Sequence, residues 1–274
     1  MIVVDIDAPM MKPEFERIGA KTLIIDHHMI RTDLNSKQIT YINPRFGDEE
    51  IYQPASYVVY KLLSSFMKIS GLEWLAVLGT VGDFGFEDCR DILDKYMDAK
   101  SKDEVTKTKF WAVGRMLYGV IIAVSVESSG VTPKGILEIL SCAKDIDGLA
   151  KDETLVAANE MFEKEYERCK AEFWKNAETR GGIIIGTIGS PLRRLGSALA
   201  TDISIEQLDK IIMLLEKRGE SFKAHARCQS GRVHLGKLME KCCHGGGHRH
   251  AAGGSIEVNE VAIFKARIFR ELGV

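Results

Sequence analysis

Three short apolar runs open the chain, over residues 2–5, 21–26 and 39–43, and the first two end in an aspartate. Their length and their content of isoleucine and valine are typical of strands buried inside a parallel sheet. A helical pattern follows, because apolar side chains form two adjacent i, i+4 rows over residues 55–69. Residues 72–81 are more hydrophobic all round, as expected of a buried helix. The first part of the chain therefore predicts an α/β domain built on a parallel sheet.

The rest of the chain changes character twice. Residues 110–126 and 155–173 carry helical patterns, and the charged face of the second indicates a long surface or interdomain helix. From Gly181 onward the segments become short and β-rich, with a hairpin turn expected at residues 217–220. We therefore predict three parts: an α/β domain over residues 1–105, a helical connector over residues 106–180 and a smaller α/β domain over residues 181–274.

Composition limits the environment of the chain and its partners. Its 274 residues are 45% hydrophobic and 28% charged, enough to bury a core, and the net charge of −2 argues against an overall electrostatic hold on nucleic acid. Six scattered cysteines favour free thiols in a reducing compartment. The apolar run at residues 118–126 is too short to cross a membrane, and the first residues do not resemble a signal peptide. We expect a cytoplasmic protein with no membrane partner, and the oligomeric state stays open.

Acidic and imidazole side chains gather after the predicted strands. Asp5 ends the first strand, Asp26-His27-His28 follows the second, and Asp83 lies in a glycine-rich segment. In an open α/β sheet, side chains at the carboxyl ends of several strands converge. A single aspartate at a strand end more often serves a turn than binds an ion, but carboxylates combined with imidazoles suit Mn²⁺, Mg²⁺ or Zn²⁺. The combination predicts a divalent-metal site.

A second cluster lies between a helix expected at residues 233–242 and a strand expected at residues 255–258. Residues 245–254 contain five glycines and two alanines, which permit the close backbone approach and positive φ of a phosphate-binding loop. Histidines and an arginine in the same segment add hydrogen-bond donors for phosphate oxygens. We therefore expect a substrate-binding loop whose members are Gly245, Gly246, Gly247, His248 and Arg249.

The same region invites a zinc interpretation, because Cys242, Cys243, His244, His248 and His250 are close in sequence. Adjacent cysteines do not readily replace a spaced CxxC pair, and no second pair lies nearby in the sequence. The spacing therefore disfavours a structural zinc site, and the two cysteines are better explained as the buried end of a helix.

The first cluster resembles a known family. Asp26-His27-His28 looks like the triplet that names the DHH phosphoesterases, and Asp5 and Asp83 lie about where other metal-binding aspartates of that family belong. The resemblance implies that Asp5 bridges two metal ions, while His27 and Asp83 bind one of them. It also implies that Asp26 orients an imidazole and that His28 faces the metals or the scissile phosphate. The implied cofactor is Mn²⁺ or Mg²⁺, as one or two ions.

The second cluster resembles the GGGHxxAAG element of the DHHA1 domain, the more specific of the two signatures. Residues 223–227 are similar to the basic strand of that domain, although His225 stands where a serine is commoner. The resemblance implies that Arg227 and His248 hold the phosphate or terminal nucleotide of a substrate. Residues 41–44 look like the RecJ-like branch of archaea and bacteria, and we expect the archaeal type. The implied fold is a parallel-sheet DHH domain truncated at its N-terminus, a helical connector and a smaller α/β DHHA1 domain.

One part of the family pattern is missing from this sequence. Members normally open with a strand and a loop carrying histidine and aspartate, which supply ligands to both ions, and no residue before Asp5 can take that role. One ion position keeps three protein ligands and the other keeps only Asp5, so the second ion should bind weakly. The chain would then be a fragment of a longer enzyme, one part of a site completed by another polypeptide, or a degenerate member that binds without cleaving.

Three functions follow from the resemblance. The first, which we expect, is a metal-dependent phosphodiesterase that hydrolyses single-stranded DNA or short RNA or DNA oligonucleotides, as a RecJ-like exonuclease. The second is a catalytically impaired nucleic-acid-binding or scaffold protein with replication or repair partners. The third is a phosphoesterase for cyclic dinucleotides or other small molecules.

Overall fold

The computed structural model describes residues 1–7 and 11–274, except for the side chains of residues 102 and 103. The chain forms two compact units. The first comprises Met1–Tyr118 and Lys134–Leu155, and the second comprises Gly119–Pro133 and Val156–Val274. The domain boundaries predicted at residues 105 and 180 stay a prediction.

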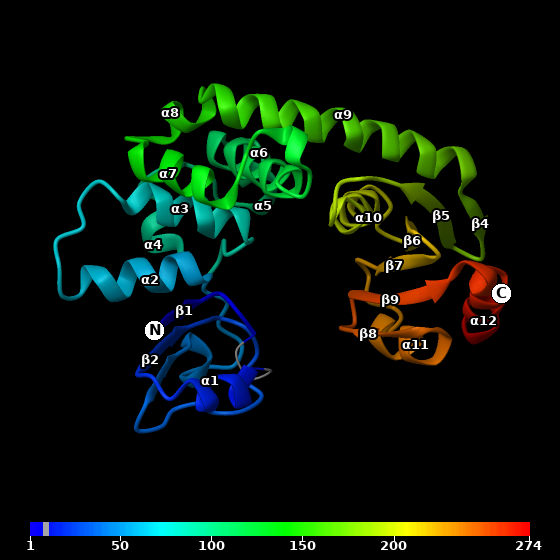
Figure 1. The fold of residues 1–274 in the computed structure, drawn as a ribbon, viewed down its shortest axis with the longest axis horizontal. Helices are drawn as coiled ribbons and strands as arrows, with labels where there is room; N and C mark the ends of the chain where they lie inside the picture. Colours follow the sequence, from blue (N-terminus) through cyan, green and yellow to red (C-terminus); the bar gives the residue numbers. More distant parts are fainter. Residues whose placement is uncertain (8–10) are drawn as a thin grey trace. The chain divides into compact units, whose positions relative to one another are not determined.

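The first unit contains a three-stranded parallel sheet in the order β1 (Ile2–Val4), β2 (Thr22–Ile25), β3 (Ile39–Ile42), drawn in blue in Figure 1. The register places the last residue of β1 beside the last residue of β2, which lies beside the last residue of β3. All three strands therefore end at one edge, where the residues that follow them are brought together. The three strands predicted from the sequence are confirmed, with ends that differ by one residue at most.

The core beneath this sheet joins the strands to α1 (Lys12–Ile18) and to the segment before β3. Its buried side chains are Phe15, Ile24, Leu34, Ile39 and Tyr41. The other helical segments of this unit are η2 (Pro44–Phe46), α2 (Ala55–Ser64), α3 (Glu73–Gly82), α4 (Arg90–Leu93), α5 (Lys102–Val105), the first part of α6 (Lys109–Ala123), α7 (Pro133–Cys142) and α8 (Ile146–Ala150).

Helix α3 determines where Asp83 lies, because that residue follows its last turn. The helix is apolar on most sides, and Val77 and Val81 are fully buried. A Cβ atom on Gly79 would lie 2.6 Å from the Cβ atom of Ser56 in α2. Glycine at this position therefore allows the two helices to approach closely. The buried helix expected at residues 72–81 is confirmed, displaced by one residue.

The second unit is built on a six-stranded sheet in the order β4-β5-β6-β7-β9-β8. Strands β5 and β6 pair in parallel, and the other neighbours are antiparallel. The strands are β4 (Glu178–Arg180), β5 (Ile183–Gly189), β6 (Ile211–Arg218), β7 (Ser221–Arg227), β8 (His244–Gly247) and β9 (Ala251–Glu257). The turn expected at residues 217–220 is confirmed, since β6 and β7 pair up to Arg218 and Ser221.

Helices cover both faces of this sheet, as Figure 1 shows. Side chains of β5 and β6 alternate between two cores, so that Ile184 and Ile212 face one layer while Ile185 and Met213 face the other. The first layer contains α9 (Glu153–Asn176) and α10 (Leu195–Glu206), and the second contains α11 (Leu235–Cys242) and α12 (Val261–Leu272). The unit also contains the end of α6 and two 3-10 helices, η3 (Glu127–Ser129) and η4 (Val258–Glu260).

The predicted fold class is confirmed: an α/β unit with a parallel sheet is combined with a second, mixed α/β unit. The prediction that residues 245–254 form a loop is wrong, because all but the turn at His248–His250 belong to strands β8 and β9. The strand expected at residues 255–258 accordingly begins earlier, at Ala251. Within the described part of the chain, no helix is both long enough and apolar enough to span a membrane.

Candidate metal centre

The candidate centre lies where the strands of the first unit end. The backbone N–H of Asp5 donates to the carbonyl of Ile25 (3.0 Å), and that of Asp26 donates to Ile42 (3.0 Å), which continues the sheet pairing one residue past each strand. Asp5 has a φ of 61°, a left-handed conformation that aspartate adopts more readily than most residues. The sheet thus fixes the backbone at the residues whose side chains are needed.

Two carboxylates converge on one imidazole nitrogen. Nε2 of His27 lies 3.1 Å from Oδ1 of Asp5 and 3.4 Å from Oδ2 of Asp83. The His27 side chain is 7% exposed, whereas those of Asp5 and Asp83 are about half exposed, at 59% and 48%. These residues come from the ends of β1, β2 and α3, so the three metal ligands assigned from the sequence lie together.

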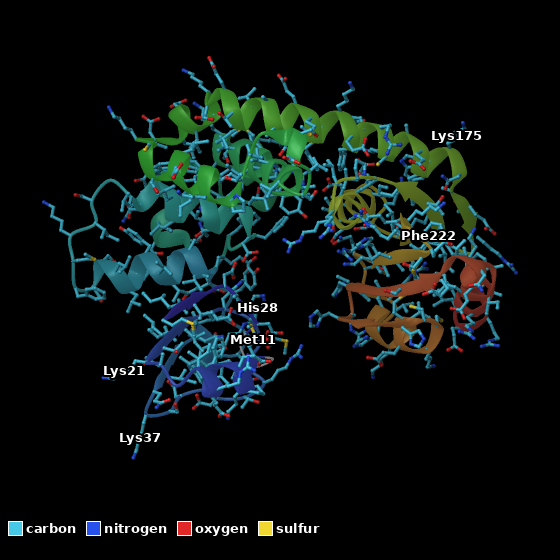
Figure 2. All side chains as sticks on the ribbon, viewed as in Figure 1. Met11, Lys21, His28, Lys37, Lys175 and Phe222 are labelled. Atoms are coloured by element: carbon cyan, nitrogen blue, oxygen red, sulfur yellow. The ribbon has the colours of Figure 1, made fainter. Side chains whose placement is uncertain are left out.

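The second histidine is oriented by the first residue of the triplet. Nδ1 of His28 lies 2.7 Å from Oδ1 of Asp26, whose side chain is fully buried. Asp26 contacts Nδ1 of this ring and not Nε2, and the His28 side chain is 44% exposed. Donor atoms of Asp5, His27 and His28 lie within 4.8 Å of one another. The side chain of His28 is labelled in Figure 2.

Three residues outside the predicted site form hydrogen bonds with its members. Nδ2 of Asn43 donates to the carbonyl of His28 (2.9 Å), and Nε of Arg45 donates to the carbonyl of His27 (3.0 Å). The hydroxyl of Tyr52 donates to Oδ2 of Asp83 (3.1 Å). Asn43 belonged to a segment noted for its family likeness, but neither Arg45 nor Tyr52 carried a recognisable signal. Their roles depend on tertiary contacts.

The charges of the cluster influence one another. The hydrogen bond from His27 lowers the pKa of Asp5, against the opposite effect of burial. Burial acts to lower the pKa of His27, but the hydrogen bond to Asp5 and the charge of Asp83 outweigh it and raise that pKa. Burial raises the pKa of Asp83. The pKa of Tyr52 is raised as well, first by burial and then by the nearby Asp83 carboxylate. The carboxylates of Asp5 and Asp83 therefore stabilise positive charge on His27, and the same carboxylates would stabilise a bound cation.

The donor set fits a divalent ion. Carboxylate oxygens together with one imidazole are the ligands that Mn²⁺ and related ions accept. Two buried polar atoms, Oδ2 of Asp26 and Nδ1 of His27, have no hydrogen-bond partner among the described residues. With a proton on Nδ1, Nε2 of His27 presents its lone pair between the two carboxylates. Asp5, His27 and Asp83 can therefore hold a metal, and Tyr52, whose hydroxyl donates to Asp83, is an outer support.

The residues predicted to bind substrate phosphate lie in the second unit. Arg227 ends β7, and its guanidinium donates from Nε to Oγ1 of Thr201 (3.0 Å) and from one terminal nitrogen to Oγ of Ser197 (2.9 Å). Both hydroxyls belong to α10, a helix that was not predicted from the sequence. Its serine, threonine and aspartate content weakens the helical signal. The guanidinium is thus held against α10 at the end of β7.

The glycines of the second cluster serve close backbone packing. Gly245 and Gly246 of β8 pair with Gly254 and Gly253 of β9. A Cβ atom on Gly245 would lie 2.4 Å from the carbonyl oxygen of Gly253. Glycine therefore allows a tight hairpin here, and this is why a segment expected to be a loop forms strands instead.

The tip of this hairpin closes over the start of α11. The carbonyls of His248 and Arg249 accept hydrogen bonds from the backbone N–H groups of Gly236 (3.0 Å) and Leu235 (3.1 Å). Gly247 has a φ of 141° and, like His248 and Arg249, is exposed. The backbone of the tip is fixed while these side chains stay accessible, and their phosphate role stays a prediction.

His225, at a position where a hydroxyl is commoner, contacts a buried carboxylate. Its Nε2 lies 3.2 Å from Oε2 of Glu216, which is fully buried and also accepts from Arg218 (2.6 Å). Arg218 in turn donates to the carbonyls of Ser190 and Leu192, in the segment that precedes α10. This network links β6 and β7 to that segment, and the His225 ring is engaged in it through Glu216.

Comparison with known families identifies the C-terminal part of the chain, since residues 193–273 match the DHHA1 domain. They form a DHHA1 domain. The match includes both the strand that ends in Arg227 and the glycine-rich hairpin, so the two features predicted from the resemblance belong to one recognised domain. No curated protein matches the chain.

Solved structures extend the likeness over nearly the whole chain. RecJ from Thermus thermophilus in complex with Mn²⁺ is 15% identical, with a TM-score of 0.67, over 97% of this chain and 44% of that one. The DHH domain of a member of the s1p family of ribosomal proteins is 15% identical (TM-score 0.64, 99% and 69% of the two chains). The pGpG-specific phosphodiesterase PggH from Vibrio is 13% identical (0.56, 94% and 87%).

These matches establish the fold and limit the inference about activity. The chain spans 44% of the length of the Thermus RecJ, so the activity of that whole protein is not carried over by the likeness. A second crystal structure of that RecJ contains Mg²⁺, and divalent metal use is therefore found among proteins of this fold. The DHHA1 match and the structural matches together support the DHH/DHHA1 family.

Proposed function

We propose that this chain is a divalent-metal-dependent phosphodiesterase of the RecJ-like kind, acting on single-stranded DNA or short oligonucleotides. The observation that carries the proposal is the convergence of Asp5 and Asp83 on Nε2 of the buried His27, at 3.1 Å and 3.4 Å. Three separate elements contribute to this cluster, and the two carboxylates are about half exposed, so they do not serve to fill the core. The fold, shared with Mn²⁺-bound RecJ, supports the same conclusion.

Asp5, His27 and Asp83 would hold the ion, which can be Mn²⁺ or Mg²⁺. When bound, a divalent ion supplies positive charge to a phosphodiester and activates water as its nucleophile. Asp26 fixes His28 through Nδ1, and Nε2 of His28 is then available to a phosphate or leaving-group oxygen. Since Asp5 alone is assigned to a second ion position, we propose that one ion binds tightly and another weakly.

In the second unit, Arg227, His248 and Arg249 would bind the substrate's phosphate. The hydroxyls of Ser197 and Thr201 keep the guanidinium of Arg227 in one orientation, as two-point recognition of phosphate requires. The backbone contacts of the hairpin tip fix the main chain at His248 and Arg249, from which these side chains would reach the phosphate. The cytoplasmic location and the replication or repair partners stay predictions.

A second candidate substrate is a linear dinucleotide. It is supported by the likeness to the pGpG-specific phosphodiesterase, which covers 94% of this chain and 87% of that one. The substrate named for that protein, pGpG, is a linear dinucleotide. The two candidates share one active site and differ in the length of the preferred substrate.

The test is hydrolysis with and without metal. Purified protein is incubated with 5′-labelled single-stranded DNA, short RNA, pGpG and a cyclic dinucleotide, with Mn²⁺, with Mg²⁺ or with EDTA. We expect metal-dependent release of nucleotides, which EDTA abolishes, and the relative kcat/KM values identify the substrate. The Asp83→Ala variant should lose at least about 100-fold in rate, since even outer supports of a metal are worth about 10–100-fold.

The matched control is Asp209→Ala, because that aspartate is exposed, lies in the second unit and belongs to neither of the predicted clusters. It should retain full activity. Hydrolysis that survives Asp83→Ala would indicate a contaminating nuclease. Binding of single strands without hydrolysis of any of the substrates would replace the enzyme by a nucleic-acid-binding protein of the same family.

A further inference from the structure

A pocket of about 780 Å³ adjoins the metal centre in the first unit. Its lining includes three aromatic side chains, those of Tyr52, Phe84 and Phe86. Tyr52 belongs to both sites, because its hydroxyl donates to Oδ2 of Asp83 and its ring centroid lies 5.3 Å from that of His27. A ligand in this pocket would therefore lie next to the metal ligands.

Phe84, the residue directly after Asp83, has a strained backbone. Its φ is 60°, in the left-handed region that bulky side chains avoid. The turn is anchored, since the N–H of Phe84 donates to the carbonyl of Val81 (3.2 Å) and that of Gly85 donates to Thr80 (2.9 Å). A Cβ atom on Gly85 would lie 2.4 Å from Cδ of Pro54, so this turn cannot shift readily. Strain that persists in a fixed turn beside a candidate site points to a role for the strained residue.

The ring of Phe84 is held by its neighbours and still reaches solvent. It makes edge-to-face contacts with Trp111 (centroids 5.3 Å apart, 73° between planes) and with Phe86 (5.9 Å, 61°). Phe86 is 9% exposed, whereas Phe84 is 43% exposed. Fixed aromatic rings of this kind are the surfaces on which nucleobases stack.

The charged residues of the pocket indicate which part of a nucleotide it accepts. Glu50 and Glu87 line it and would repel a phosphate. Both cations of the lining are already paired: the guanidinium of Arg90 donates to Asp94 and to the carbonyl of Ala99, and the ammonium of Lys100 lies 3.6 Å from Asp94 and 3.5 Å from Asp98. Carboxylates accept hydrogen bonds from the amino and imino groups of bases. The lining therefore suits a base more than a sugar-phosphate backbone.

We infer that Phe84 is a stacking platform for the nucleobase adjacent to the scissile phosphate, with the pocket around Tyr52 and Phe86 as its binding site. The inference rests on the proposed function, which places that phosphate at Asp5, His27 and Asp83. It adds a substrate requirement to that function: the nucleotide must carry a base at this position. The strained turn after Asp83 couples the metal ligand to the platform.

The experiment measures binding without turnover. A dinucleotide carrying 2-aminopurine is titrated with protein in EDTA, and quenching of its fluorescence reports stacking. Wild-type protein should quench it, and Phe84→Ala should weaken binding about tenfold, within the range that one base–aromatic stack contributes. Phe66→Ala, which removes a 66% exposed phenylalanine outside the pocket, should bind like wild type.

A second variant separates stacking from folding. Both variants lose the ring contacts with Trp111 and Phe86, but glycine tolerates a φ of 60° better than alanine does. Phe84→Gly should therefore unfold at a higher temperature than Phe84→Ala while weakening binding as much. With Mn²⁺, KM for a normal dinucleotide should rise about tenfold in both variants, and KM for one with an abasic site should not change.

The two proposals fail in different ways. Equal binding by wild type, Phe84→Ala and Phe84→Gly would overturn the platform even if hydrolysis proceeds. Equal losses on normal and abasic substrates would overturn it too. Quenching that depends on Phe84 without any hydrolysis would support the platform and remove the phosphodiesterase.

Discussion

In the first unit the candidate metal centre is formed by side chains, whereas in the second unit the glycine-rich segment allows close backbone packing. At the metal centre, Asp5, His27 and Asp83 come from three elements and meet within 3.1–3.4 Å at one nitrogen. In the hairpin, glycines let two strands and the start of α11 approach at distances that a Cβ atom would prevent. In the sequence both segments predicted a functional site, but a high content of histidine and glycine does not indicate whether side-chain or backbone atoms are used.

Asp26→Asn should have the largest effect among the variants that separate the two units. The buried carboxylate contacts His28 at 2.7 Å and is not one of the three assigned metal ligands, so its loss should disturb catalysis more than metal binding. We expect kcat to fall by about 10–100-fold, a part of the roughly 10²–10⁴-fold that a positioned acid or base contributes. Rates and Mn²⁺ affinity by calorimetry are measured together. A kcat within about twofold of wild type would show that Asp26 is only a packing residue.

Gly236→Ala tests the backbone role of the second unit. The added Cβ atom would lie 2.1 Å from the carbonyl oxygen of Gly247, and backbone cannot move aside cheaply. We expect a loss of about 1–3 kcal/mol in the free energy of unfolding, measured with urea. The Mn²⁺ affinity of the first unit should not change. Gly189→Ala is the control, because its Cβ atom meets nothing within 4 Å. Equal stability of the two variants would contradict the packing explanation.

The smallest effect is expected from Arg227→Lys, which keeps the charge but loses the planar fork held by Ser197 and Thr201. Binding of single-stranded DNA, measured by anisotropy in EDTA, should weaken about tenfold, the loss expected for one charged hydrogen bond. Arg227→Lys that binds like wild type would make this arginine a structural link between β7 and α10 rather than a phosphate ligand.

Much of the fold was predictable because its signals are local. The strands of the first unit, the buried helix α3 and the long helix α9 each have a run or a repeat of apolar side chains within one segment. Helix α10 was missed because its serine, threonine and aspartate residues are weak helix formers, and its burial against β6 and β7 stabilises it instead.

The amino-acid pattern alone indicates which residues follow the strands of a parallel sheet, and because parallel strands end at one edge it predicts that Asp5 and the histidine pair meet. Three features depend on long-range contacts instead: Tyr52 supports Asp83, Phe84 is held in a strained turn beside it, and the glycines form a hairpin. The difference lies in the distance along the chain over which each signal acts. Periodicity is written within one segment, whereas close backbone approach and a shared carboxylate depend on segments far apart in the chain.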